Sequence, residues 1–162
     1  MFRPQIQKTS TLFVIALFNL LMVYLSVNSK YKVELPGFKD RINATENMAN
    51  SIEFLNSKKT FEFENFDRFK SSLIGVEASS ITTKFDPDSS MIKSKVVVTH
   101  PNFAAYIVDK FYELGIKEND EIAVSMTGSF PGANIALLSA CKAMSIKASI
   151  ITSAGSSSWG AN

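Results

Sequence analysis

The residues best suited to chemistry lie in two short segments rich in serine and glycine. The first, TGSFPG at residues 127–132, follows an alternating apolar run and leads directly into a helical pattern. The second, TSAGSSSWGAN at residues 152–162, follows the next apolar run. Glycines allow a backbone to approach a ligand closely, and main-chain N–H groups at a helix start attract anions. This composition predicts a site that captures a carboxylate or a phosphate.

We expect the two segments to lie side by side, because each follows a strand and the ends of parallel strands meet at one edge of a sheet. The candidate ligand contacts are Gly128, Ser129, Gly132, Asn134, Ser156, Ser157, Ser158 and Trp159. The first segment matches neither the GxGxxG nor the P-loop pattern. The alternative is a plain helix cap, in which the side chain of Ser129 or Asn134 accepts from helix N–H groups.

A serine nucleophile is the other chemistry to weigh. Ser129 lacks the Gly-x-Ser-x-Gly surroundings of a nucleophile elbow, since Thr127 and Pro131 stand where glycines are needed. The sole histidine, His100, precedes Pro101 at a helix start, which is typical of a solvated turn residue. The catalytic residues are therefore unknown from the sequence, and a non-enzymatic role is favoured.

Composition excludes several classes of protein. The 17 basic and 15 acidic residues are scattered, without the basic stripe of a nucleic-acid-binding protein. The single cysteine, Cys141, excludes a disulfide within the chain and a CxxC metal site, and reads as a small core residue of a helix. We expect no metal and no cofactor.

The elements that must position the two segments follow from hydrophobic periodicity. Apolar residues at steps of four, four and three predict a helix at 102–114, which Gly115 ends in a left-handed conformation. A strand at 121–127, a helix at 131–145 and a strand at 147–152 follow. This βαβ unit should cross over right-handedly and make its two strands parallel.

The preceding part of the chain is less regular. Residues 40–57 predict an amphipathic helix with Asp40 as a possible N-cap. Residues 73–77 predict a short strand, followed by a third Ser/Thr-rich loop, and residues 95–98 predict either a brief strand or a lead into the next helix.

Residues 11–27 carry no charge and are apolar all round a helix, which predicts a membrane segment. We favour the interpretation that this segment is a retained membrane anchor, and a cleaved signal peptide is the alternative. Basic residues flank the segment on both sides, so the positive-inside rule does not settle the orientation, although we favour an extracytoplasmic soluble domain. The predicted organisation is a short head at 1–10, the anchor at 11–27, a juxtamembrane helical segment at 28–60 and an α/β domain at 61–162.

The fold class predicted is α/β, with an N-terminal transmembrane helix followed by an incomplete parallel-sheet domain. Parallel sheets are normally covered on both faces, and the predicted elements cannot cover this one. Either the chain is a fragment of a longer protein, which we favour, or a partner supplies the cover.

Four ordered motifs resemble the poly-γ-glutamate system protein family. They are LIGVEASSITT at 73–83, PNFAA at 101–105, GSFPGANIA at 128–136 and SSSWGAN at 156–162. Members of that family are bacterial membrane-anchored proteins that accompany the synthesis and export machinery of poly-γ-glutamate capsules. The resemblance covers about residues 73–162, implies that this is the N-terminal portion of a member, and carries no catalytic residue with it.

The resemblance implies a membrane-anchored accessory protein of capsule synthesis or export, whose partners are the synthase or export membrane proteins. In this reading the Ser/Gly loops bind carboxylates of the polymer. A γ-glutamyl hydrolase or transferase with Ser129 or Ser156 as nucleophile is one alternative, which a base within reach of either serine would favour. A non-catalytic scaffold that docks the synthesis complex through an apolar surface is the other.

Overall fold

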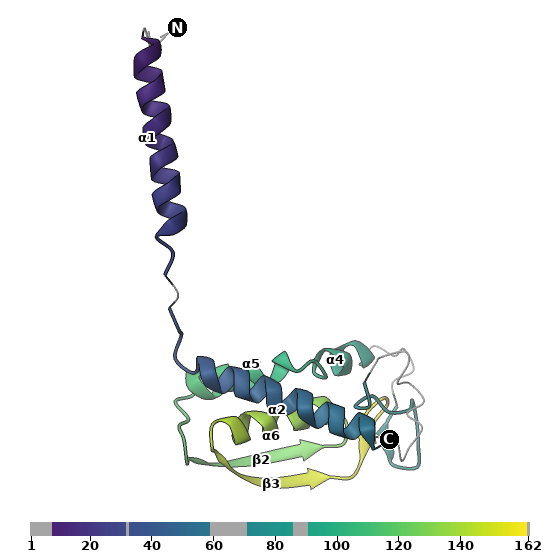
Figure 1. Cartoon of the computed structure of the whole chain (residues 1–162). Coiled ribbons are helices and arrows are strands. Elements are labelled where there is room, and N and C mark those ends of the chain that lie inside the picture. Colours follow the sequence, from purple (N-terminus) through teal and green to yellow (C-terminus); the bar gives the residue numbers. More distant parts are fainter. Residues whose placement is uncertain (1–7, 32, 59–70, 86–90, 162) are drawn as a thin grey trace, which may run out of the picture. The chain divides into compact units, whose positions relative to one another are not determined.

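The computed structural model describes residues 8–31, 33–58, 71–85 and 91–161. It divides the chain into two compact units, Met1–Leu35 and Pro36–Asn162. Within the described part it is a mixed structure of helices and short parallel strands, with one apolar helix near the N-terminus (Figure 1).

The first unit contains helix α1 (Thr9–Asn28), whose side chains are all exposed. Its 20 residues span about 30 Å at the helical rise, which is the thickness of a bilayer hydrocarbon core. By length and composition α1 can cross a membrane, and a signal sequence near the N-terminus has the same properties. The helix extends slightly beyond the predicted segment 11–27 at both ends.

The second unit begins with helix α2 (Phe38–Ser57) and continues with β1 (Thr82–Lys84), α4 (Ile92–Val97) and α5 (Asn102–Glu113). It ends with β2 (Glu121–Thr127), α6 (Pro131–Ala143), β3 (Lys147–Ser153) and β4 (Ser156–Ser157). The four longer elements predicted from residue 102 onward are confirmed within two residues at each boundary. Gly115 follows α5 in the left-handed conformation, at φ 73°, as predicted.

Parallel pairing brings β2 beside β3 and, separately, β1 beside β4. The β2–β3 register runs from Glu121 opposite Lys147 to Thr127 opposite Ser153. Helices α2, α5 and α6 lie on one side of the β2–β3 sheet (Figure 1). Because side chains alternate across a strand, Ile122 and Ala148 face this side and pack against the core.

The core is formed mainly by the three helices. Ala44 and Met48 of α2, Ala104 and Val108 of α5, and Ala136 and Ala140 of α6 are completely buried. Small residues at these positions let the helix backbones approach closely, and Met48 fills the space between them. Leu114, the last residue of the predicted helix 102–114, is 74% exposed, and α5 ends one residue before it.

The second face of the β2–β3 sheet is open to solvent. Every residue of β3 except Ala148 is exposed, and Ile151 is 79% exposed. Only one face of this parallel sheet is therefore covered by described residues.

Three predictions for the earlier part of the chain are corrected. Asp40 does not cap α2, because the helix begins at Phe38 and Gly37 occupies the N-cap in a left-handed conformation. Residues 73–77 form no strand, although Leu73 and Ile74 are buried. Residues 95–98 form no strand, since residues 95–97 belong to helix α4 and Val98 is its C-cap.

Two further features differ from the predicted organisation. The third Ser/Thr-rich loop contains strand β1, and β4 forms within the last Ser/Gly segment. Helix α2, predicted within a separate segment at 28–60, packs on α5 and α6 inside the second unit. The ion pair between Arg41 of α2 and Asp109 of α5 joins two of these helices.

Candidate functional site

The two Ser/Gly segments meet where strands β2 and β3 end. The Ala161 N–H donates to the Gly128 carbonyl oxygen at 2.7 Å, and the Ser156 hydroxyl donates to the same oxygen at 3.1 Å. The Ser157 N–H donates to the Ser129 hydroxyl oxygen at 3.0 Å. The convergence expected from strand topology is thus present in the structure.

The hydroxyl and N–H groups of these segments are bonded largely to one another. The Asn134 side-chain amide donates to the Thr127 carbonyl oxygen at 2.8 Å. The main chain of the second segment also pairs with β1, because the Ser156 and Ser158 N–H groups donate to the carbonyl oxygens of Ile81 and Lys84. Ser156, Ser157 and Ser158 are consequently almost completely buried.

The alternative in which Ser129 or Asn134 caps α6 is wrong. The N-cap residue of α6 is Phe130, which makes no side-chain capping bond. Pro131 occupies the first turn, as its fixed φ and missing N–H favour.

Close backbone contact explains two of the glycines. A Cβ on Gly132 would lie 2.7 Å from the Val98 carbonyl oxygen, and a Cβ on Gly160 would lie 2.6 Å from the Gly128 carbonyl oxygen. Gly128 is less constrained, since its nearest contact would be 3.1 Å. Trp159 adopts a left-handed φ of 63°, and it packs with Ile74 and Ile92 in a small buried cluster.

A lysine that sequence reasoning missed lies at the centre of this arrangement. Lys95 of α4 is 1% exposed, and its Nζ donates to the Ser129 carbonyl oxygen and, at 2.9 Å, to the Ser157 hydroxyl. The ammonium also lies 4.6 Å from the centre of the Phe130 ring, within cation–π range. A buried cation is costly unless such groups surround it.

We call the residues Lys95, Ser129, Phe130, Ser156 and Ser157 the lysine–serine cluster. The burial of Lys95 has a sequence signal. Lys95 follows Ile92 by three residues, so the two side chains lie on the same buried face of α4. The signal is lost when residues 95–98 are read as a strand.

His100 is an exposed turn residue outside this cluster. Its Nδ1 accepts a hydrogen bond from the Asn102 N–H at 3.2 Å. Cys141 is buried in α6, and this burial raises the pKa of its thiol, as is usual for a structural cysteine. Among the described residues, no group of three or more His, Cys, Asp or Glu side chains is arranged to hold a metal ion.

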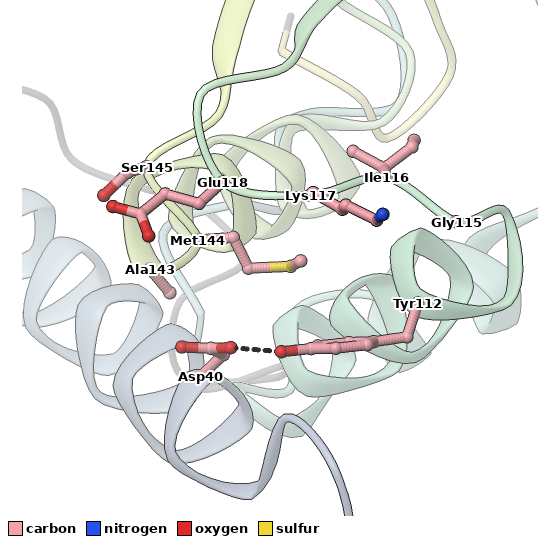
Figure 2. A pocket seen from close by; sticks show the side chains of 9 residues that line it. All are labelled: Asp40, Tyr112, Gly115, Ile116, Lys117, Glu118, Ala143, Met144 and Ser145. Atoms are coloured by element: carbon pink, nitrogen blue, oxygen red, sulfur yellow. Dashed lines mark hydrogen bonds between the residues drawn. The ribbon is translucent and has the colours of Figure 1, made fainter.

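A cavity of about 490 Å³ lies at the other end of the β2–β3 sheet, beside the residues that precede the strands (Figure 2). It is bounded by the start of α2, the end of α5 and the turn after α6. The Tyr112 hydroxyl donates to Asp40 Oδ2 at 2.6 Å across one of its walls. This hydrogen bond raises the pKa of Tyr112 above its usual value of 10.0, with smaller contributions from burial and from the Asp40 charge.

Comparison with known proteins gives no relative. No family model matches the chain, and no curated protein or solved structure matches it.

Proposed function

We propose that this chain is a single-pass, membrane-anchored accessory protein of bacterial poly-γ-glutamate synthesis or export, and that the edge carrying its lysine–serine cluster binds carboxylates of the polymer. Its partners would be the membrane proteins that make or export the polymer. The four sequence motifs support the pathway, and the apolar helix α1 supports the anchor.

The observation that carries the binding role is the buried Lys95 ammonium behind both segments. A fixed positive charge in a region of low dielectric attracts anions more strongly than an exposed lysine does. Poly-γ-glutamate presents one carboxylate per residue, so many weak contacts can act together. The half-buried Ser129 and Phe130 are the parts of the cluster that reach the surface.

The test compares Lys95→Met with Lys93→Met, which removes an exposed lysine of the same helix. A capsulated host lacking the gene is complemented with each variant, and polymer inside and outside the cells is measured. We expect Lys93→Met to restore export and Lys95→Met to fail while still accumulating in the membrane. Full export with Lys95→Met would refute carboxylate binding by the cluster.

A second candidate function, acyl transfer, rests on the 2.9 Å separation of Lys95 Nζ and the Ser157 oxygen, which would also permit a hydrogen bond of the opposite direction, from the Ser157 hydroxyl to a neutral Lys95 amine. A neutral lysine amine can take the proton of a serine that attacks a carbonyl, as in serine–lysine hydrolases. This nucleophile differs from the Ser129 and Ser156 expected from the sequence. Covalent labelling of Ser157 by a fluorophosphonate, lost in Ser157→Ala and kept in Ser139→Ala, would favour this function over simple binding.

A further inference from the structure

The cavity at the far end of the sheet combines charges of both signs with an apolar floor. Figure 2 shows the carboxylates of Asp40 and Glu118 on one side and the Lys117 ammonium on the other, with Met144 between them. Its volume of about 490 Å³ lies within the range of small-molecule sites. The cavity therefore fits a small ligand whose two ends carry opposite charges.

The charged groups of the cavity retain capacity for a ligand. Asp40 uses Oδ2 to accept from Tyr112, and a carboxylate can accept further hydrogen bonds through both oxygens. Within the described ranges, neither Lys117 nor Glu118 takes part in an ion pair. The Tyr112 hydrogen bond also fixes the Asp40 carboxylate, so part of the site is ordered before a ligand arrives.

We propose that this cavity binds a zwitterionic small molecule of the amino-acid class, with its ammonium at Asp40 and Glu118 and its carboxylate at Lys117. Met144 and the half-buried Ile116 would contact the carbon skeleton between the charges. This inference does not depend on the proposed function, because no residue of the lysine–serine cluster lines the cavity.

Calorimetric titration of the full chain in detergent micelles tests the proposal with three probes. Glutamate carries both charges, N-acetylglutamate lacks the ammonium, and n-butylamine lacks the carboxylate. We expect saturable binding of glutamate. The affinities of the other two probes should be lower by about tenfold or more, because each of them lacks at least one charge-assisted hydrogen bond to the cavity. Equal affinity for glutamate and N-acetylglutamate, or no saturable binding of glutamate, would overturn the proposal.

Variants locate the binding. Lys117→Met and Glu118→Gln change exposed side chains, and Asp40→Asn removes the fixed carboxylate. We expect each to weaken glutamate binding, whereas Glu53→Gln and Lys142→Met, which line other cavities, leave it unchanged. Wild-type affinity in both Lys117→Met and Glu118→Gln would also overturn the proposal.

Discussion

At the scale of single residues, the charged side chains at the two ends of the β2–β3 sheet differ in their burial. Lys95 is buried and bonded to the serine segments, whereas Asp40 remains half-buried beside a cavity and bonded to one tyrosine. A buried charge is stabilised only by its protein partners, whereas a half-exposed charge is also solvated by water.

The Tyr112–Asp40 hydrogen bond predicts a measurable dependence on pH. Because the pKa of Tyr112 is raised on folding, the protonated phenol is favoured in the folded state. The bond's contribution to stability is fully present below the unfolded pKa near 10.0 and is lost as pH rises through the folded pKa. Asp40→Asn should lower this folded pKa.

Spectrophotometric titration of phenolate absorbance measures that change. A difference between wild type and Tyr112→Phe isolates the signal of this tyrosine from the other three. Glu53→Gln serves as the control that removes a distant carboxylate. An identical Tyr112 curve in wild type and Asp40→Asn would contradict the role given to the hydrogen bond.

At the scale of elements, helix α2 supplies a large part of the core. We expect Met48→Ala to destabilise the protein by about 2–4 kcal/mol, since it leaves a cavity between helices. Phe54→Ala removes a larger side chain from the same helix, but Phe54 is 59% exposed, so its cost should stay below about 1 kcal/mol. Urea unfolding of the two variants provides the comparison, and a cost for Phe54→Ala equal to that of Met48→Ala would argue against the packing of α2.

Substitution of Gly132 tests the close contact between the start of α6 and the segment that follows α4. Its Cβ position lies 2.7 Å from the Val98 carbonyl oxygen, and that oxygen belongs to backbone. Gly132→Ala should therefore destabilise by about 1–2 kcal/mol, although alanine is the better helix former. Circular dichroism melts can measure the effect, and a raised melting temperature would show that the helix simply moves aside.

The elements predicted well from the sequence are those whose pattern is local. Helix α5 and strands β2 and β3 each carry enough residues for periodicity to distinguish helix from strand. Strands β1 and β4 hold three and two residues, and their pairing joins positions 73 residues apart, as in the bond from Thr83 to Ser156. No local pattern predicts such a pair.

The same distinction explains what could be predicted of the lysine–serine cluster. Strand topology brought Ser129 and Ser157 together correctly, because parallel strands end at one edge. Lys95 was missed because its helix has only six residues. The mutual hydrogen bonding of the segments could not be predicted either, since it depends on side-chain directions that composition does not specify.

At the scale of the whole molecule, α1 is long and apolar enough to cross a membrane, and a signal sequence has the same properties. We predict that α1 is retained as an anchor, because its length and its uncharged, largely apolar composition suit a span. The protein should then remain in the membrane fraction after a high-salt wash and be released only by detergent. Recovery of a soluble form with a new N-terminus near Lys30 would show instead that a signal peptidase had removed it.

The contacts of Lys95 also bear on the order in which the second unit folds. Two of its hydrogen bonds reach residues 34 and 62 positions later in the chain, whereas α5 and α6 need only nearby residues to form. Contacts that close long loops form late, because the chain must lose the entropy of closing the loop before the contact contributes any stabilisation. The hydrogen bond between Lys95 and Ser157 would therefore be among the last contacts of the second unit to form. Pulsed hydrogen exchange should then show the amides of α5 and α6 protected before those of Ser156 and Ser158.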